Sequence, residues 1–182
     1  CVELPRKLYE HWLEQPEVLQ KFAIHAETGE PIPRDLLKRM LGAANFDMGF
    51  QTVEYIASAL VDLAFHEGPA PVDIMARQTE ILSEISMPDA IGMRHATPQF
   101  AHVFAGDGYS SAYYSYMWSE VMDADAFASF ESLGGAFDPE RAQSLHDCIL
   151  SKGGSEDEEQ LYLAFRGRMP DASALLKNRG LD

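Results

Sequence analysis

Residues 100–120 read FAHVFAGDGYSSAYYSYMWSE, a stretch that combines a histidine, a glycine-punctuated loop and a row of tyrosines. Glycine tolerates positive φ and the close approach of a ligand, so Gly106 and Gly108 predict a flexible loop between residues 104 and 109. No glycine or proline interrupts residues 110–130, which predicts one long helix.

Four polar side chains would share one face of this helix, at the spacing i, i+4, i+7 and i+11. A row of aromatic residues at helical spacing commonly fills a core, and core packing is one interpretation of it. A buried phenol also needs a hydrogen-bond partner, so the alternative is the polar wall of a cleft. His102, just before the loop, is either a hydrogen-bonded structural residue or a catalytic one. The four residues of the row are Tyr109, Tyr113, Tyr116 and Glu120.

Composition predicts a single ordered domain over residues 1–182, since 46% of the 182 residues are hydrophobic. With 29 acidic and 14 basic residues the formal charge is −15, which repels phosphate backbones and anionic lipids. We therefore expect neither nucleic acid nor a membrane as partner. Cys1 and Cys148 form no CxxC motif, which favours a reducing, cytoplasmic location.

Start and stop signals divide the chain into helices joined by short loops, and strands are hard to find. The predicted fold is therefore all-α. In the segment 46–67 we expect a buried stripe of Tyr55, Ala59, Leu60, Leu63 and Ala64. The predicted helices are residues 5–15, 16–27, 34–46, 46–67, 71–85, 110–130, 138–150 and about 171–177.

Two helix starts carry specific capping signals. Asp138 followed by Pro139 provides an N-cap residue and a proline in the first turn. Ser155 with Glu158 three residues later has the pattern of a capping box, which makes Ser155 the expected N-cap.

The chain by itself holds no complete catalytic motif. His66-Glu67 is its one His-Glu dipeptide, but Ala70 stands where an HExxH motif needs the second histidine. The six histidines include no pair spaced i, i+4, and no GxSxG sequence occurs. These 182 residues alone therefore supply no two-histidine zinc site.

Several phrases resemble those of the zinc metallopeptidases that include thimet oligopeptidase, oligopeptidase A and peptidyl-dipeptidase. The resemblance is to the C-terminal portion of that family and covers essentially the whole chain. It rests on Val2-Glu3-Leu4-Pro5, Tyr9-Glu10-His11-Trp12, residues 100–120, residues 151–157 and Phe165-Arg166-Gly167-Arg168.

The resemblance implies a zinc site that is shared between distant parts of one enzyme. Two histidines and a base glutamate come from an HExxH helix in that family, and the Glu of the phrase at Val2–Pro5 is the third ligand. Glu3 is therefore the metal ligand that the resemblance implies. Arg6-Lys7 replaces the Ser-Gln of many relatives, so the packing beside this ligand differs.

The resemblance also assigns roles within the tyrosine-rich stretch. Tyr116 takes the place of the tyrosine that stabilises the transition state, and Tyr113 that of a residue lining the substrate subsites. His102 matches a histidine that contacts substrate near the scissile bond. Gly106, Gly108 and Tyr109 match a mobile loop that closes over the peptide.

We accordingly expect the intact protein to be a zinc-dependent peptidase acting on short peptides, with this chain as its helical C-terminal half. The chain opens in mid-phrase at Cys1, so we expect the N-terminal part of the same enzyme to lie upstream and to carry HExxH. Without that part the chain should not catalyse. The alternative is a stand-alone helical module that binds peptides without a metal.

The acidic composition makes a direct prediction. Because a formal charge of −15 repels the DNA backbone, the chain should not retain duplex DNA in a gel-shift assay. Low salt is the stringent condition, since electrostatic attraction is least screened there. Tight retention would contradict the expected choice of partners.

Overall fold

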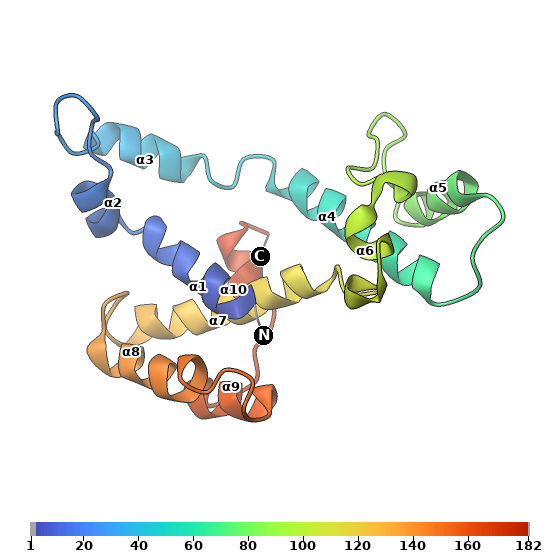
Figure 1. The fold of residues 1–182 in the computed structure, drawn as a ribbon. Helices are drawn as coiled ribbons and strands as arrows, with labels where there is room; N and C mark the ends of the chain where they lie inside the picture. Colours follow the sequence, from blue (N-terminus) through green and yellow to red (C-terminus); the bar gives the residue numbers. More distant parts are fainter. Residues whose placement is uncertain (1–2, 182) are drawn as a thin grey trace. The chain divides into compact units, whose positions relative to one another are not determined.

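The computed structural model describes residues 3–181, and within that range the fold is all-α, as predicted (Figure 1). One isolated antiparallel bridge, between Ile24 and Pro31, is the extended pairing found there. The helices are α1 Glu3–Leu13, α2 Pro16–Phe22, α3 Arg34–Gly42, α4 Met48–His66, α5 Ile74–Glu84, α6 Ala101–Phe104, α7 Ser115–Leu133, α8 Pro139–Leu145, α9 Glu158–Arg166 and α10 Ser173–Asn178.

The contacts divide the chain into two compact units. The first unit comprises the residues up to Phe46 together with those from Trp118 onward, and the second runs from Asp47 to Met117. The single domain over residues 1–182 stays a prediction.

The first unit has its core where α1 meets α7 and the helices after it. Leu4 and Leu8 are 2% and 1% exposed, as the spacing of the first helix predicts. Trp12, one turn further on, packs edge-on against Phe127 and Phe130, with ring centroids 5.1 and 5.2 Å apart. Such edge-to-face contacts add to the stabilisation from apolar burial.

A buried carboxylate joins α7 to α9 in this unit. Asp125 is 1% exposed, and its Oδ2 accepts hydrogen bonds from Tyr162 and from Arg166 Nε, both at 2.9 Å. Arg168 donates to the other oxygen of the same carboxylate. Burial and the bond to Asp125 raise the pKa of Tyr162, so its hydroxyl stays protonated and donates.

The core of the second unit lies between α4, α5 and α6. Val61 and Val103 are fully buried there, and Phe100 is 2% exposed. Gln78 on α5 holds the loop that comes after that helix, because its Oε1 accepts from the N–H and the hydroxyl of Thr97 at 2.8 and 2.9 Å. This loop joins α5 to the 3₁₀ turn at Thr97–Gln99.

The buried face of α4 differs from the prediction. Of the expected stripe, Ala59 is buried, whereas Tyr55, Leu60, Leu63 and Ala64 are half-buried. The buried face of α4 instead includes two polar residues, Ser58 and Asp62, and each has hydrogen-bond partners within the second unit. The buried residues of α4 are Ala57, Ser58, Ala59, Val61 and Asp62.

The prediction of one helix over residues 110–130 is wrong at its start. The helix α7 begins at Ser115, after a 3₁₀ turn at Asp107–Tyr109. Ser111 has a φ of +56°, which a right-handed helix cannot contain. Tyr109 and Tyr113 therefore precede the helix, and the predicted row does not form on one helical face.

Of the two predicted N-caps, one is confirmed and the other is wrong. Asp138 is an N-cap as predicted, since Oδ1 accepts from the N–H of Arg141 at 2.7 Å. The expected cap Ser155 is wrong: Asp157 caps α9 and accepts from the N–H of Gln160 at 3.1 Å. Asp157 directly precedes the first helical residue in extended conformation, the place where an N-cap acts.

Tyr162→Phe should lower the free energy of unfolding by about 1–3 kcal/mol, because the ring volume stays and the buried Asp125 loses a donor. Chemical denaturation of both proteins measures the difference. Tyr9→Phe is the matched control, since Tyr9 is 51% exposed and should change stability little. Equal stability of the two variants would contradict a stabilising role for the Tyr162 hydroxyl.

Candidate active site

A cavity of about 380 Å³ lies in the second unit, beside the tyrosine-rich stretch. Its wall combines the loop before α6, the α6 helix itself and the start of α7. Imidazoles and phenols supply most of its polar groups, which suits the recognition of a polar ligand. The lining residues are His95, Gln99, Phe100, Ala101, His102, Tyr113 and Tyr116.

Tyr116 and His102 meet in this cavity. The Tyr116 hydroxyl lies 3.2 Å from His102 Nε2, within hydrogen-bond distance. Tyr116 is half-buried in the first turn of α7, and His102 is exposed on α6. The two groups that the sequence placed near each other are thus in direct contact.

Tyr109 lies beside His102, although it belongs to the 3₁₀ turn before α7 and not to the predicted helix. It lies outside α7, yet its ring stacks on His102 with centroids 4.7 Å apart and planes 15° apart. Tyr109 is 58% exposed, so it forms an outer edge of the site.

Tyr113 forms the inner part of the wall. Its ring stacks on Tyr55 at 5.2 Å and meets Tyr116 edge-on at 5.6 Å. Burial raises the pKa of Tyr113, against an opposing effect of Arg94. Its hydroxyl is therefore protonated near neutral pH and available as a donor.

The glycines of the loop lie outside the left-handed region that favours glycine. Gly106 is extended, with φ 164° and ψ 175°, and Gly108 lies outside the left-handed region. A Cβ added at either position would meet no heavy atom of the described chain within 4 Å. Neither close approach nor positive φ requires a glycine there, so the expected mobility of this loop stays a prediction.

His95 was missed by the sequence analysis. Its ring stacks on Phe100 at 4.7 Å, and its Nδ1 lies 3.4 Å from Ser58 Oγ. Burial lowers the pKa of His95, and the nearby Arg94 lowers it further. A histidine in an irregular loop has no periodic signal, so the sequence offered nothing to separate it from the other histidines.

Asp62 was also missed, although it had a visible signal. It is an acid within the apolar sequence of α4, where an unpaired charge would be strongly unfavourable. Its carboxylate accepts the backbone N–H groups of Ser111 and Tyr113 at 3.1 and 2.9 Å. The position of Tyr113 thus depends on a residue outside the tyrosine-rich stretch.

Glu120, the fourth member of the predicted row, serves another purpose. It belongs to the first unit, where Lys7 Nζ donates to its Oε1 at 2.7 Å and Arg179 donates to Oε2. These partners neutralise it. The prediction that Glu120 lines the same wall as the tyrosines is therefore not supported.

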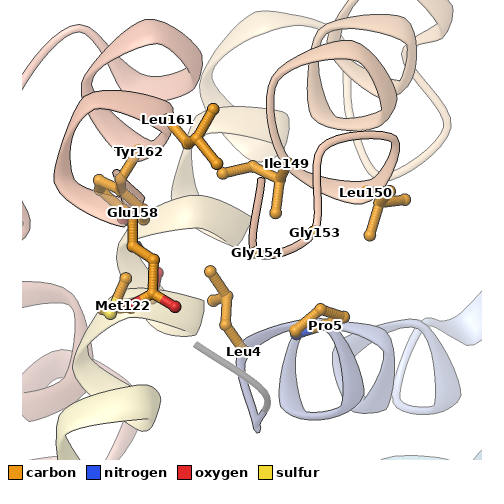
Figure 2. A pocket seen from close by; sticks show the side chains of 10 residues that line it. All are labelled: Leu4, Pro5, Met122, Ile149, Leu150, Gly153, Gly154, Glu158, Leu161 and Tyr162. Carbon is orange, nitrogen blue, oxygen red and sulfur yellow. Dashed lines mark hydrogen bonds between the residues drawn. The ribbon is translucent and has the colours of Figure 1, made fainter. Parts of the chain in front are cut away.

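Glu3 is the first residue of α1, in the first unit. Its side chain is 30% exposed, and Oε2 accepts from Arg6 Nε at 2.8 Å. The adjacent Leu4 extends into an apolar cavity of about 250 Å³, facing Ile149 (Figure 2). Leu4 packs there with Met122 and Tyr162, so apolar burial anchors the helix turn that carries Glu3.

The donor set for a metal is incomplete in this part of the protein. Residues 3–181 contain no cluster of three or more His, Cys, Asp or Glu side chains arranged to hold a metal ion. Glu3 offers one carboxylate, a ligand type that zinc accepts. The role of Glu3 as a metal ligand stays a prediction.

Tyrosine hydroxyls and imidazoles thus gather around one cavity of the second unit. The sequence model of a family described as "Peptidase family M3" matches residues 1–181, and the chain belongs to that family. This confirms the resemblance drawn from the sequence phrases.

Curated relatives match the whole chain. It is 38% identical to oligopeptidase A of Escherichia coli over 187 residues, and 36% identical to dipeptidyl carboxypeptidase of Salmonella typhimurium over 186 residues. It is 34% identical to the organellar oligopeptidase A of Arabidopsis thaliana over 191 residues. Each match covers 100% of this chain, but the chain spans 27%, 27% and 24% of the three relatives.

Between residues 3 and 181 no helix has both the length and the apolar character needed to cross a membrane.

The pKa of His95 yields a prediction about acid stability. Because the folded-state pKa lies below the ordinary value of 6.5, the unfolded chain binds more protons at His95 than the folded chain. The contribution of neutral His95 is therefore full above about pH 6.5 and is lost as the pH falls further. His95→Gln should weaken this pH dependence in denaturation curves between pH 7.5 and 5, and an unchanged slope would contradict it.

Proposed function

We propose that the protein carrying this chain is a zinc-dependent peptidase that hydrolyses short peptides. Membership of peptidase family M3 implies a metallopeptidase. The relatives named above are oligopeptidases and a dipeptidyl carboxypeptidase, which supports short peptides as substrates. Since the chain spans about a quarter of their length, its principal partner is the remainder of the same enzyme.

The observation that carries this proposal is the contact between Tyr116 and His102 inside a cavity. At 3.2 Å the hydroxyl and Nε2 orient each other, and both border a space of about 380 Å³. Attack of water on a peptide carbonyl places negative charge on the carbonyl oxygen, and a preorganised O–H donor stabilises that charge. Tyr116 is the donor in this proposal.

His102 and Tyr113 support that donor. His102 contacts substrate near the scissile bond and fixes the direction of the Tyr116 hydroxyl. Tyr113, protonated because burial raises its pKa, lines the substrate subsite and offers a second O–H. A second donor would share the stabilisation of the same oxygen.

The outer part of the site binds the peptide. Tyr109 is exposed and stacks on His102, so it is accessible to a ligand. We assign Gly106, Gly108 and Tyr109 to substrate binding, as a segment that covers the bound peptide.

Glu3 is the proposed metal ligand of this chain. Its carboxylate would hold Zn²⁺ together with two histidines of an HExxH helix outside these residues. Bound zinc would polarise the scissile carbonyl and activate the attacking water. Leu4, buried at 2% exposure, keeps the first turn of α1 in place for this role.

A cytoplasmic location remains part of the proposal. The low cysteine count favours it, whereas one relative is an organellar enzyme. Nucleic acid and membranes are not proposed as partners.

Tyr116→Phe, made in the full-length protein, should lower kcat on the order of a hundredfold with little change in KM, because the lost O–H acts in the transition state. Peptide hydrolysis kinetics measure both constants. Tyr114→Phe is the control, since Tyr114 is 52% exposed and does not line the cavity. A full-rate Tyr116→Phe enzyme would remove this tyrosine from the mechanism.

The chain alone should bind Zn²⁺ with a dissociation constant on the order of millimolar or weaker, since one carboxylate cannot replace three ligands. Equilibrium dialysis of residues 1–182 measures this affinity. A tight, stoichiometric site would refute the shared site and require ligands other than Glu3.

A further inference from the structure

Asp62 is a carboxylate enclosed in the apolar interior of the second unit. Its side chain is 0% exposed, and it lies in α4 between Val61 and Leu63. Removing a carboxylate from water is strongly unfavourable unless hydrogen-bond donors replace the water. The donors that meet Asp62 therefore show what this residue does.

Two of these donors are backbone groups of the tyrosine-rich stretch. Oδ1 accepts from the N–H of Ser111 at 3.1 Å, and Oδ2 accepts from the N–H of Tyr113 at 2.9 Å. His66 adds a third, with Nδ1 2.9 Å from Oδ1 and 2.8 Å from the Asp62 carbonyl oxygen. Because both neighbours of Nδ1 are acceptors, Nδ1 carries a proton.

The backbone held by Asp62 is strained. Ser111 has a φ of +56°, in the left-handed region that residues other than glycine adopt at a cost. Such a conformation persists where surrounding contacts determine it, and here two N–H groups converge on one carboxylate. The turn ends directly before α7, which begins at Ser115 and carries Tyr116 in its first turn.

A second residue of α4 holds the same segment from its other side. Tyr55 lies two turns before Asp62, and its hydroxyl donates to the carbonyl of Tyr113. The same hydroxyl accepts from the N–H of Met117 at 3.2 Å. The backbone of Tyr113 is thus held at its N–H by Asp62 and at its carbonyl by Tyr55.

We propose that Asp62 and Tyr55 are positioning residues for the tyrosine pair Tyr113 and Tyr116. They set the turn before α7 and the first turn of that helix, so the two phenols meet at 5.6 Å beside the cavity. The inference rests on the proposed function, because it assigns Asp62 and Tyr55 to the orientation of the proposed oxyanion donor.

Asparagine is the informative replacement for Asp62. A carboxylate has acceptors on both oxygens, whereas an amide turns a donor toward one of the two backbone N–H groups. Asp62→Asn keeps the volume and removes one of the two anchors. Misplacement of the tyrosines should lower kcat in the full-length protein on the order of tenfold or more, with KM little changed.

The decisive measurement is a double-mutant cycle. Asp62→Asn, Tyr116→Phe and the double variant are assayed for kcat and KM on one peptide. If Asp62 acts through Tyr116, Asp62→Asn should add little to the loss already caused by Tyr116→Phe. Independent, multiplying losses would show a general structural role and overturn the proposal.

The outcomes separate this proposal from the proposed function. Full turnover of Asp62→Asn with an impaired Tyr116→Phe enzyme would overturn the positioning role alone. Full turnover of Tyr116→Phe would overturn both. Tyr55→Phe is the second variant, for the case that Asp62→Asn does not fold. Tyr55→Phe keeps the aromatic ring and should lower kcat as Asp62→Asn does. Combined with Tyr116→Phe it should likewise add little to the loss, and full turnover of Tyr55→Phe would overturn the proposal.

Asp125→Asn is the matched control for the loss of a buried carboxylate. Asp125 is 1% exposed and bonded to Tyr162, Arg166 and Arg168, all in the first unit. This control should lower the melting temperature without lowering kcat once the protein is folded. A kcat loss equal to that of Asp62→Asn would show that general loosening, rather than positioning, causes the effect.

Discussion

A carboxylate without water must be surrounded by donors, and this requirement shapes both units. Asp62 recruits two backbone N–H groups and an imidazole, and Asp125 recruits a phenol and two guanidinium groups. Apart from His66, which lies one turn from Asp62 on the same helix, the donors come from sequence positions far from the acid. Apolar packing gives the helices their buried faces, but it has no direction, whereas these hydrogen bonds determine which backbone segment meets which helix.

The position of α1 likewise depends on apolar burial together with directional polar contacts. Leu4 and Leu8 bury its apolar face. Apolar packing has no direction, so it does not by itself fix the rotation of the helix. A salt bridge and a hydrogen bond supply direction: Lys7 pairs with Glu120, and His11 Nε2 lies 2.8 Å from Asp123 Oδ1. Burial raises the pKa of Asp123, and the bond to His11 opposes that rise. Glu3 lies on the same helix, where its carboxylate pairs with Arg6.

The sequence was a good guide wherever the signal was local. Asp138 with Pro139 marked a helix start correctly, because capping needs residues that are adjacent in sequence. Tyr116 and His102 were placed together from a short, recognisable phrase, and the structure joins them at 3.2 Å. The sequence from Ser155 to Glu158 fits the capping-box pattern, yet Asp157, two residues after Ser155, is the N-cap of α9.

The features that the sequence could not predict depend on distant partners. The start of α7 was expected five residues too early, because the turn at Ser111 is imposed by Asp62 from another helix. Glu120 was grouped with the tyrosines by spacing, yet its partners are Lys7 and Arg179. His95 entered the cavity wall from a loop. Each error has the same origin, since periodicity describes one element and says nothing of the elements that pack against it.

The π turn at His146–Leu150, which continues α8, has a geometric consequence. In an α-helix each residue advances the direction of its side chain by about 100°. A π turn widens the helix locally and changes the direction in which the next side chains point. Ile149, inside this turn, packs against both apolar clusters of the first unit, the one around Phe130 and the one around Tyr162. The segment that contains the π turn therefore borders two hydrophobic clusters at once.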